Sequence, residues 1–142
     1  MYSQIGAEKI PLEQEIEYIG QYIDLQKLRL NRHTVVEFYH SVDDGSTLIP
    51  PMIFITFVEN AFKYGTSSEL DCKVEITMEQ KEGILTFNTK NRIIRQREKE
   101  ENAPIGIENC RKRLDRLYGS RYKLENYAED GIYYTHLEII LK

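Results

Sequence analysis

The spacing of apolar residues along the chain predicts three helices and five strands. Apolar residues recur at helical spacing over residues 10–30, 51–64 and 105–119. The first stripe contains Leu12, Ile16, Ile19, Ile23 and Leu30. Alternating or β-branched segments over residues 34–41, 72–80, 83–91, 122–129 and 133–141 are typical of strands.

Prolines, glycines and acids mark the ends of these segments. Pro11 predicts the first turn of the first helix, where Glu13 and Glu15 would face the positive end of the helix dipole. Pro51 fits the first position of the second helix in the same way. The second helix is expected to end at Gly65 and the third at Gly119.

The order of the segments predicts the fold class. Turn residues at 81–83 and at Asp130-Gly131 join neighbouring strands and indicate antiparallel hairpins. The order α-β-α-β-β-α-β-β favours an α+β protein with two layers, in which about three helices cover one face of a mixed, mostly antiparallel sheet.

Composition and charge narrow the class of protein. The 142 residues are 41% hydrophobic and 30% charged, which is typical of one globular domain. No apolar run approaches the roughly 20 residues of a membrane helix, and the first ten residues do not resemble a signal peptide. The net charge of −4 argues against nucleic acid as a partner. Cys72 and Cys110 suggest neither a disulfide framework nor a metal site, so a reducing, cytoplasmic setting is expected.

The second predicted helix ends with polar residues that could carry chemistry. Glu59, Asn60 and Lys63 lie in its last two turns within "VENAFKYG", and Asn60 shares a helix face with Lys63 and Tyr64. An amide oxygen can bind Mg²⁺, and an ammonium group can neutralise a phosphate oxygen. Taken alone, the ordinary explanation of a polar helix end is the stronger one.

Two further candidates lie later in the chain. Asn91 closes a strand before a charged segment, and Gly106 begins the third helix, where free N–H groups favour an anion. A turn residue and a flexible helix entry explain them equally well. The arginines at 111, 113 and 116 fit either phosphate binding or a solvated helix face.

The combination of "VENAFKYG", a hairpin and "GIENCRKRL" resembles the ATP-binding domain of sensor histidine kinases, within the Bergerat-type ATPases. It is similar to the membrane-receptor subfamily that reads "VENAFKHG" and "GIGLxNVRxRL", and the resemblance extends over nearly the whole chain. It implies a phosphorelay in which the γ-phosphoryl group of Mg-ATP passes to a histidine and then to an aspartate of a response regulator.

The resemblance assigns roles at the end of the second helix. Asn60 matches the amide that holds Mg²⁺ between the ATP phosphates, and Glu59 matches the acid that orients a water or the acceptor. Lys63 matches a cation on the phosphate side. Tyr64 stands where relatives usually carry histidine.

It also assigns the adenine site and the lid. Asn91 stands where many of these ATPases carry the aspartate that accepts the adenine amino group, so its amide oxygen would have to accept while its amide nitrogen points elsewhere. Gly106 and Ile107 match the end of the glycine box, with residues 92–105 as the lid. Pro104 replaces the first glycine of that box, which would weaken nucleotide binding.

No histidine of this chain fits the phosphoacceptor. His33 lies in a polar turn, and His40 and His136 lie in or beside predicted strands. The chain is therefore expected to be a fragment that does not autophosphorylate alone: residues 1–30 would link to the missing phosphoacceptor helices, and residues 31–142 would form the catalytic domain. The whole protein is expected to be a homodimer, with this domain on the cytoplasmic side of an inner-membrane receptor.

Three alternatives remain open from the sequence. A domain of the same fold with a degenerate lid could act as a protein-interaction module without nucleotide. A clamp-type ATPase is disfavoured because the chain leaves no room for a transducer domain. An α/β domain with no nucleotide is the third.

Overall fold

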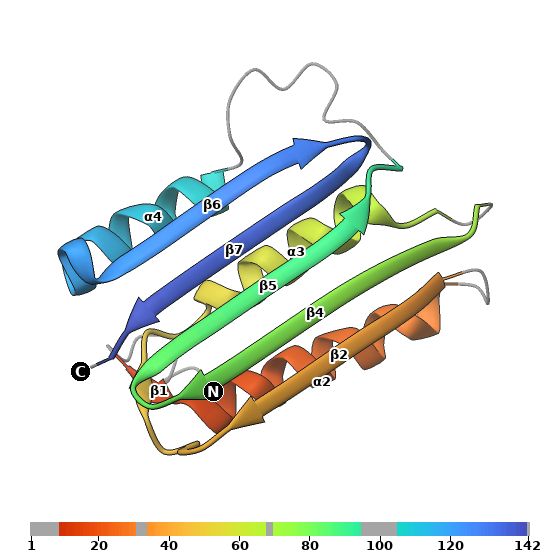
Figure 1. Ribbon diagram of the computed structural model, residues 1–142. Helices are drawn as coiled ribbons and strands as arrows, with labels where there is room; N and C mark the ends of the chain where they lie inside the picture. Colours follow the sequence, from red (N-terminus) through yellow and green to blue (C-terminus); the bar gives the residue numbers. More distant parts are fainter. Residues whose placement is uncertain (1–8, 31–33, 68–69, 95–104, 142) are drawn as a thin grey trace.

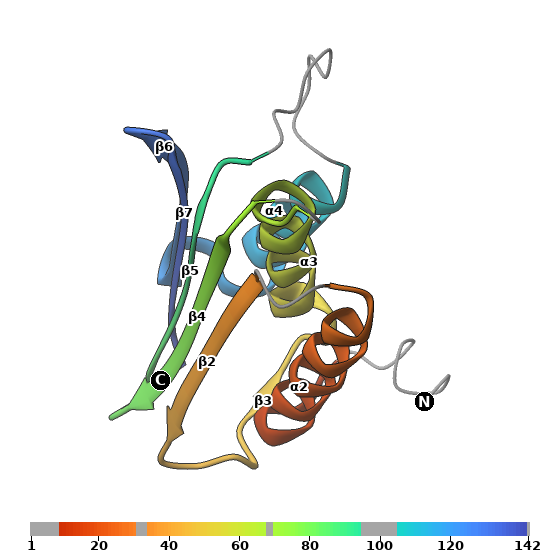
Figure 2. The same ribbon diagram turned by 90° about the vertical axis from the view of Figure 1, so that its right-hand side faces the viewer.

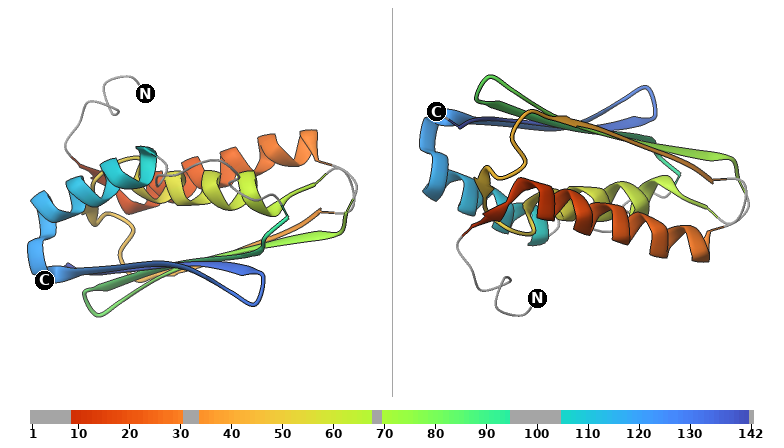
Figure 3. Two further views of the ribbon diagram at one scale, coloured as in Figure 1. Left: turned by 90° about the horizontal axis from the view of Figure 1, so that it is seen from above. Right: turned by 90° about the horizontal axis from the view of Figure 1, so that it is seen from below.

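Five strands form one sheet, and three helices lie together on one of its faces, in the part of the chain that the structure describes (Figures 1 and 2). The structure is a computed structural model that describes residues 9–30, 34–67, 70–94 and 105–141. The two layers are seen edge-on in Figure 3, with the opposite face of the sheet left open. The predicted fold class is confirmed.

The helices and strands follow the predicted segments closely. The helices are α2 (Leu12–Arg29), α3 (Ile53–Gly65) and α4 (Ile105–Tyr118), and a 3₁₀ turn (Gly119–Arg121) follows α4. Over the described residues, no helix has both the length and the apolar character needed to cross a membrane. The strands of the large sheet are β2 (Thr34–Val42), β4 (Cys72–Lys81), β5 (Ile84–Arg92), β6 (Tyr122–Glu129) and β7 (Ile132–Ile140).

The sheet is mixed, with the strand order β2-β4-β5-β7-β6. Strands β2 and β4 run parallel, and the other neighbours are antiparallel. The two predicted hairpin turns are confirmed: Glu82 and Gly83 have φ values of 54° and 84°, and Asp130 and Gly131 have 56° and 78°. Paired positive φ values match the right-handed twist of the flanking strands.

Helix α3 lies over the middle of the sheet and supplies much of the core. Phe54 and Phe57 are fully buried, and their rings lie 5.1 Å and 6.3 Å from the ring of Phe87 on β5. Helix α2 joins the same core through Leu12, Ile19 and Ile23. The domain boundary predicted at residue 30 stays a prediction.

Two details of the chain differ from the predicted pattern. Helix α3 begins at Ile53 and not at Pro51, because Met52 has a left-handed backbone with a φ of 69° that interrupts the helix before its first turn. The short strands β1 (Ile10–Pro11) and β3 (Leu48–Ile49) pair antiparallel in a second, two-stranded sheet that was not predicted. Two residues are too few for a periodic signal.

Glu15 lies in the first turn of α2, as predicted, but its side chain also serves a second helix. Its side chain is fully buried, and its carboxylate accepts hydrogen bonds from the backbone N–H groups of Met52 (3.1 Å) and Ile55 (3.4 Å). The N-cap residue of α3 is Met52, whose side chain makes no capping hydrogen bond. Glu15 of α2 therefore caps α3 from outside and joins the two helices.

The start of α2 is held by the loop between β2 and β3. The N–H groups of Leu12 and Glu13 donate to the carbonyl oxygens of Thr47 (2.7 Å) and Gly45 (2.9 Å). Gln80 supports this loop, because its Oε1 accepts from the Asp44 N–H at 3.0 Å and its Nε2 donates to Thr47 Oγ1 at 2.7 Å. The buried amide of Gln80 thus connects the sheet to the first turn of α2.

We expect Gln80→Leu to lower the free energy of unfolding by about 2 kcal/mol, because the Asp44 N–H and Thr47 Oγ1 lose their hydrogen bonds to the Gln80 amide. Thermal unfolding measures the loss, and amide hydrogen exchange should show faster exchange at Leu12 and Glu13. Glu79→Leu on the open face of the sheet is the control. Unchanged exchange at both amides in Gln80→Leu would contradict this role.

Candidate functional site

Asn60 lies on the buried side of α3, with 9% of its surface exposed. The partly exposed stripe of the helix contains Thr56, Glu59 and Lys63. Neighbouring residues on a helix point about 100° apart, so the Glu59 carboxylate reaches solvent while the amide of Asn60 faces inward. Two adjacent residues of the predicted site therefore serve different sides of one helix.

The C-terminal end of α3 contacts the C-terminal end of β5. The Ile94 N–H donates to the carbonyl oxygen of Tyr64 at 2.9 Å. A Cβ atom built on Gly65 would lie 2.7 Å from both Cβ and Nδ2 of Asn91. Asn91 therefore packs directly against the last turn of the helix that carries Asn60.

The N-terminal end of α4 contacts α3 on the other side of Asn60. A Cβ atom on Gly106 would lie 3.1 Å from Cγ2 of Thr56, and Ile107 is buried in the core. Thr56 and Tyr64 stand one helical turn before and after Asn60, on the same face. The structure thus places Gly106 and Asn91, from segments far apart in the sequence, against the two ends of α3, before and after the turn that carries Asn60.

Asn91 has a buried acceptor without a partner. Only 1% of its surface is exposed, and its Nδ2 donates to the carbonyl oxygen of Arg92 at 3.0 Å. Its Oδ1 has no hydrogen-bond partner among the described residues, and neither has Oγ1 of Thr89, which stands two positions earlier on the same face of β5. Buried acceptors are normally paired, so this end of β5 suits a ligand that brings a hydrogen-bond donor.

Lys63 and Tyr64 lie next to each other at the end of α3. The Lys63 Nζ lies 5.3 Å from the centre of the Tyr64 ring, while the tyrosine itself is buried. Lys63 is exposed and could move toward an anion at the helix end.

A cavity of about 360 Å³ lies between the C-terminal halves of α2 and α3. The pKa of the Glu59 carboxyl at its wall is raised by partial burial. Burial and the Glu59 charge raise the pKa of Tyr22 opposite. The cavity is lined by Tyr22, Gln26, Arg29, Leu30, Glu59, Phe62, Lys63, Thr66 and Ser67. Sequence analysis missed it, although Tyr22, Gln26 and Arg29 share one face of α2 at helical spacing.

The remaining predicted features are only partly described. Most of the predicted lid, including Pro104, lies outside the described residues. In the described ranges, no group of three or more histidine, cysteine, aspartate or glutamate side chains is placed to hold a metal ion. Magnesium at Asn60 would therefore need further oxygen ligands from a bound phosphate or from water.

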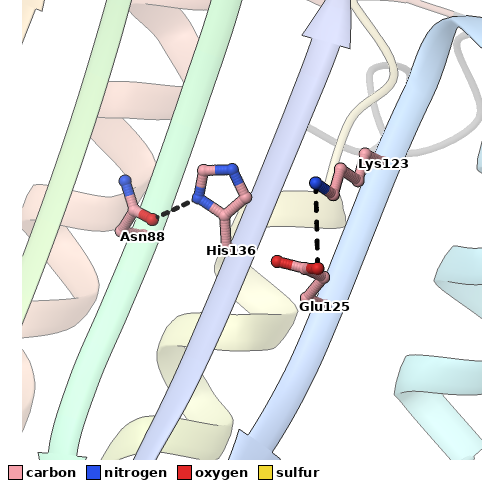
Figure 4. Close-up of polar contacts among 4 residues, drawn as sticks. All are labelled: Asn88, Lys123, Glu125 and His136. Carbon is pink, nitrogen blue, oxygen red and sulfur yellow. Dashed lines mark hydrogen bonds and ion pairs between the residues drawn. The ribbon is translucent and has the colours of Figure 1, made fainter.

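The histidines that the structure describes lie on strands. His40 on β2 is exposed and lies 5.1 Å from the Phe38 ring. His136 on β7 has its Nδ1 2.6 Å from Oδ1 of Asn88, beside the Lys123–Glu125 ion pair of 3.8 Å on the open face of the sheet (Figure 4). His33 lies outside the described residues. That the phosphoacceptor lies on another segment stays a prediction.

No protein-family model matches the chain. Two curated relatives are sensor proteins named LytS. The protein from Bacillus cereus is 32% identical over 83 residues, which cover 58% of this chain and 14% of the relative. The protein from Enterococcus faecalis is 27% identical over 145 aligned residues, which cover 92% of this chain and 24% of the relative. The chain therefore spans less than a quarter of the length of these relatives.

Solved structures share the fold. The nucleotide-free catalytic domain of histidine kinase ThkA has a TM-score of 0.64 at 16% identity, and the match covers 94% of this chain and 95% of that domain. Histidine kinase ThkA in complex with the response regulator TrrA has a TM-score of 0.60 at 17% identity, covering 94% of this chain and 41% of that one. Full-length ShkA in complex with AMPPNP has a TM-score of 0.64 at 16% identity, covering 97% and 33%. The fold of this chain is that of histidine kinase catalytic domains, and the resemblance seen in the sequence is confirmed.

Proposed function

We propose that this chain, with the fold of a histidine kinase catalytic domain, binds Mg-ATP and supplies its γ-phosphoryl group to a histidine of a two-component sensor kinase. The observation that carries the proposal is the arrangement along α3. Gly106 packs on Thr56 before Asn60, and Asn91 packs on Gly65 after it, which supports phosphates near the start of α4 and the base near the end of β5.

The base end of the nucleotide would lie at Asn91. Its buried Oδ1 would accept a hydrogen bond from the exocyclic amino group of adenine. This bond would remove the free-energy cost of leaving a buried acceptor unpaired. Thr89 offers a second oxygen to the base or to a water between them. The residues present therefore fit adenine.

The phosphate end would lie between α3 and the start of α4. The amide oxygen of Asn60 would ligate Mg²⁺, and backbone N–H groups at the first turn of α4, next to Gly106 and Ile107, would donate to phosphate oxygens. Lys63 neutralises charge from the exposed end of α3, and Tyr64 supports the helix end from inside. Bound Mg-ATP supplies the group to be transferred, and positioning with charge neutralisation supplies most of the catalysis.

Glu59 is the residue proposed to act on the acceptor. Its carboxylate is exposed about 100° around α3 from Asn60, so an acceptor imidazole can reach it without entering the core. Partial burial raises the pKa of this carboxyl, which makes it a better proton acceptor. In this role Glu59 holds the imidazole N–H while the other ring nitrogen faces the phosphate.

The relatives support a proposal about the partners of this chain. ThkA has been solved with a response regulator, and LytS proteins are named sensor proteins. We propose that this chain is the cytoplasmic catalytic part of a longer, dimeric membrane receptor, and that phosphoacceptor helices elsewhere in that receptor pass the phosphoryl group to a response regulator.

Calorimetric titration of the chain with Mg-ADP and Mg-AMPPNP tests the proposal. We expect saturable binding with a Kd below about 1 mM, weakened about tenfold or more when EDTA removes the magnesium. Absence of binding at millimolar nucleotide would overturn the proposal and favour a protein-interaction module of the same fold. Binding that EDTA does not weaken would overturn the role of magnesium.

A further inference from the structure

Helix α2 forms one wall of the cavity at Glu59. Helices α2 and α3 lie side by side on the covered face of the sheet (Figures 2 and 3). From α2, the cavity of about 360 Å³ is lined by Tyr22, Gln26 and Arg29, whose spacing of four and three residues places them on one face of the helix. Glu59 and Lys63 line the opposite wall from α3. The carboxylate proposed to act on the acceptor therefore faces a second polar wall.

Tyr22 is held in this wall as a hydrogen-bond donor. Its ring lies edge-to-face against the Phe62 ring, with the ring centres 5.5 Å apart and the planes at 88°. Burial and the charge of Glu59 raise the pKa of the Tyr22 hydroxyl, and Arg29 opposes this rise. A tyrosine with a raised pKa stays neutral at physiological pH. Its O–H group can therefore donate to a negatively charged group in the cavity.

The charges that line the cavity suit a phosphorylated imidazole. Glu59 supplies one negative charge, and Arg29 and Lys63 supply two positive charges from opposite walls. A histidine that receives a phosphoryl group has a ring N–H that donates and phosphoryl oxygens that accept and carry negative charge. A carboxylate accepts from the ring N–H, and a guanidinium group can bind two phosphoryl oxygens at once.

Two exposed leucines of α2 border the cavity. Leu25 and Leu28 are 62% and 83% exposed, and Leu25 lies three residues after Tyr22 and four before Arg29. Exposed apolar groups with a polar rim mark interaction surfaces. This chain spans less than a quarter of the length of its LytS relatives, and the acceptor helices proposed for the whole receptor lie outside it. A helix that brings its histidine to Glu59 would pass over these leucines.

We propose that α2 is the second wall of the acceptor site, where Tyr22 and Arg29 bind the phosphoryl oxygens during transfer and Leu25 and Leu28 hold the acceptor helix. In the transfer, the lone pair of one imidazole nitrogen forms the bond to phosphorus. The bond from phosphorus to the bridging oxygen breaks and ADP leaves with that electron pair, while the proton of the other imidazole nitrogen passes to Glu59. This inference rests on the proposed function and adds to it residues outside the nucleotide-binding helix.

Autophosphorylation of the whole receptor, reconstituted in lipid nanodiscs and followed with Mg-ATP labelled in the γ-phosphoryl group, tests Tyr22 and Arg29. We expect Arg29→Gln to lower kcat about a hundredfold and Tyr22→Phe about tenfold, with KM for ATP unchanged. Arg29→Lys keeps the charge and should recover part of the rate. The controls are Lys27→Gln, on the opposite side of α2, and Tyr39→Phe, on the open face of the sheet.

The docking role of the leucines is tested in the same assay. The double variant Leu25→Gln and Leu28→Gln should lower the autophosphorylation rate about tenfold, because the acceptor helix loses its apolar contacts. Leu48→Gln is the control, because Leu48 is 55% exposed on β3. A double variant with the rate of the control would overturn the docking surface.

Calorimetry with Mg-ADP separates this inference from the proposed function. All four α2 variants should bind Mg-ADP as tightly as the wild-type chain, because none of the changed side chains belongs to the proposed nucleotide site. With that binding intact, equal kcat values for Arg29→Gln and Lys27→Gln would overturn the inference alone. A loss that appears only in KM for ATP would do the same. Failure of the wild-type chain to bind Mg-ADP would overturn the proposed function and the inference together.

Discussion

Replacing Asn60 by alanine is expected to weaken Mg-nucleotide binding by about a hundredfold or more. The amide oxygen proposed to ligate magnesium is lost, and among the described buried residues of α3 no other carries a carboxamide or a carboxylate. About a hundredfold corresponds to about 2.7 kcal/mol, which is within the range for a hydrogen bond or ligand contact to a charged group. Calorimetry with Mg-ADP measures the effect.

The dependence of the affinity loss on magnesium tests whether Asn60 acts as a metal ligand. Because the missing contact is to the metal, binding in the presence of EDTA should be nearly the same for Asn60→Ala and the wild-type chain. Asn88→Ala makes the same substitution on the open face of the sheet and should leave Mg-ADP affinity unchanged. If Asn60→Ala binds Mg-ADP as tightly as the wild-type chain, the proposed metal ligand is wrong.

Replacing Glu15 by alanine is expected to lower the free energy of unfolding by about 3 kcal/mol. The change leaves the N–H groups of Met52 and Ile55 without their acceptor, and it creates a cavity at a fully buried position. For a chain of this length, a loss of that size lowers the melting temperature by roughly 10 °C. Calorimetric or circular-dichroism melting measures it, with Glu17→Ala on the exposed side of α2 as the control.

The titration of Glu15 gives this prediction a second test. Burial raises the pKa of the carboxyl above its usual 4.5, against the opposing effect of its backbone hydrogen bonds. The folded state therefore holds the Glu15 proton more tightly than the unfolded state. The contribution of Glu15 to stability is consequently greatest below its ordinary pKa and falls as the pH rises through the raised pKa of the folded state. The difference in unfolding free energy between the wild-type chain and Glu15→Gln should decrease over that range. A difference that grows with pH would mean that the ionised form is the favoured one.

Most of the fold follows from the local pattern of the sequence. Alternation over β4 and β5, and over β6 and β7, together with turn residues of positive φ, determines hairpins whose partners are close along the chain. Helical spacing locates α2, α3 and α4 to within a few residues. The start of α3 was misplaced because Met52 takes a left-handed backbone that nothing in a Pro-Pro-Met sequence indicates.

Contacts between distant segments could not be predicted in this way. An acid near the start of a helix predicts an interaction with that helix, and only the packing of α2 on α3 turns Glu15 toward the other one. The cavity between these helices arises from the same packing. For Asn91, the sequence already indicated that the amide oxygen would accept a hydrogen bond from the base and that the amide nitrogen would point elsewhere. Only the structure shows that this nitrogen donates to the Arg92 carbonyl oxygen.

The parallel pairing of β2 with β4 has a consequence for how the chain folds. The pairs β4–β5 and β6–β7 close through short turns, whereas β2 and β4 run parallel and can align only when the long connection between them crosses the face of the sheet. That connection contains α3 and therefore Asn60. The pairing of β2 with β4 is thus coupled to the seating of α3 on the sheet. When β2 is paired in register, α3 and its Asn60 should therefore also be in position. When β2 is unpaired, α3 should be less firmly placed.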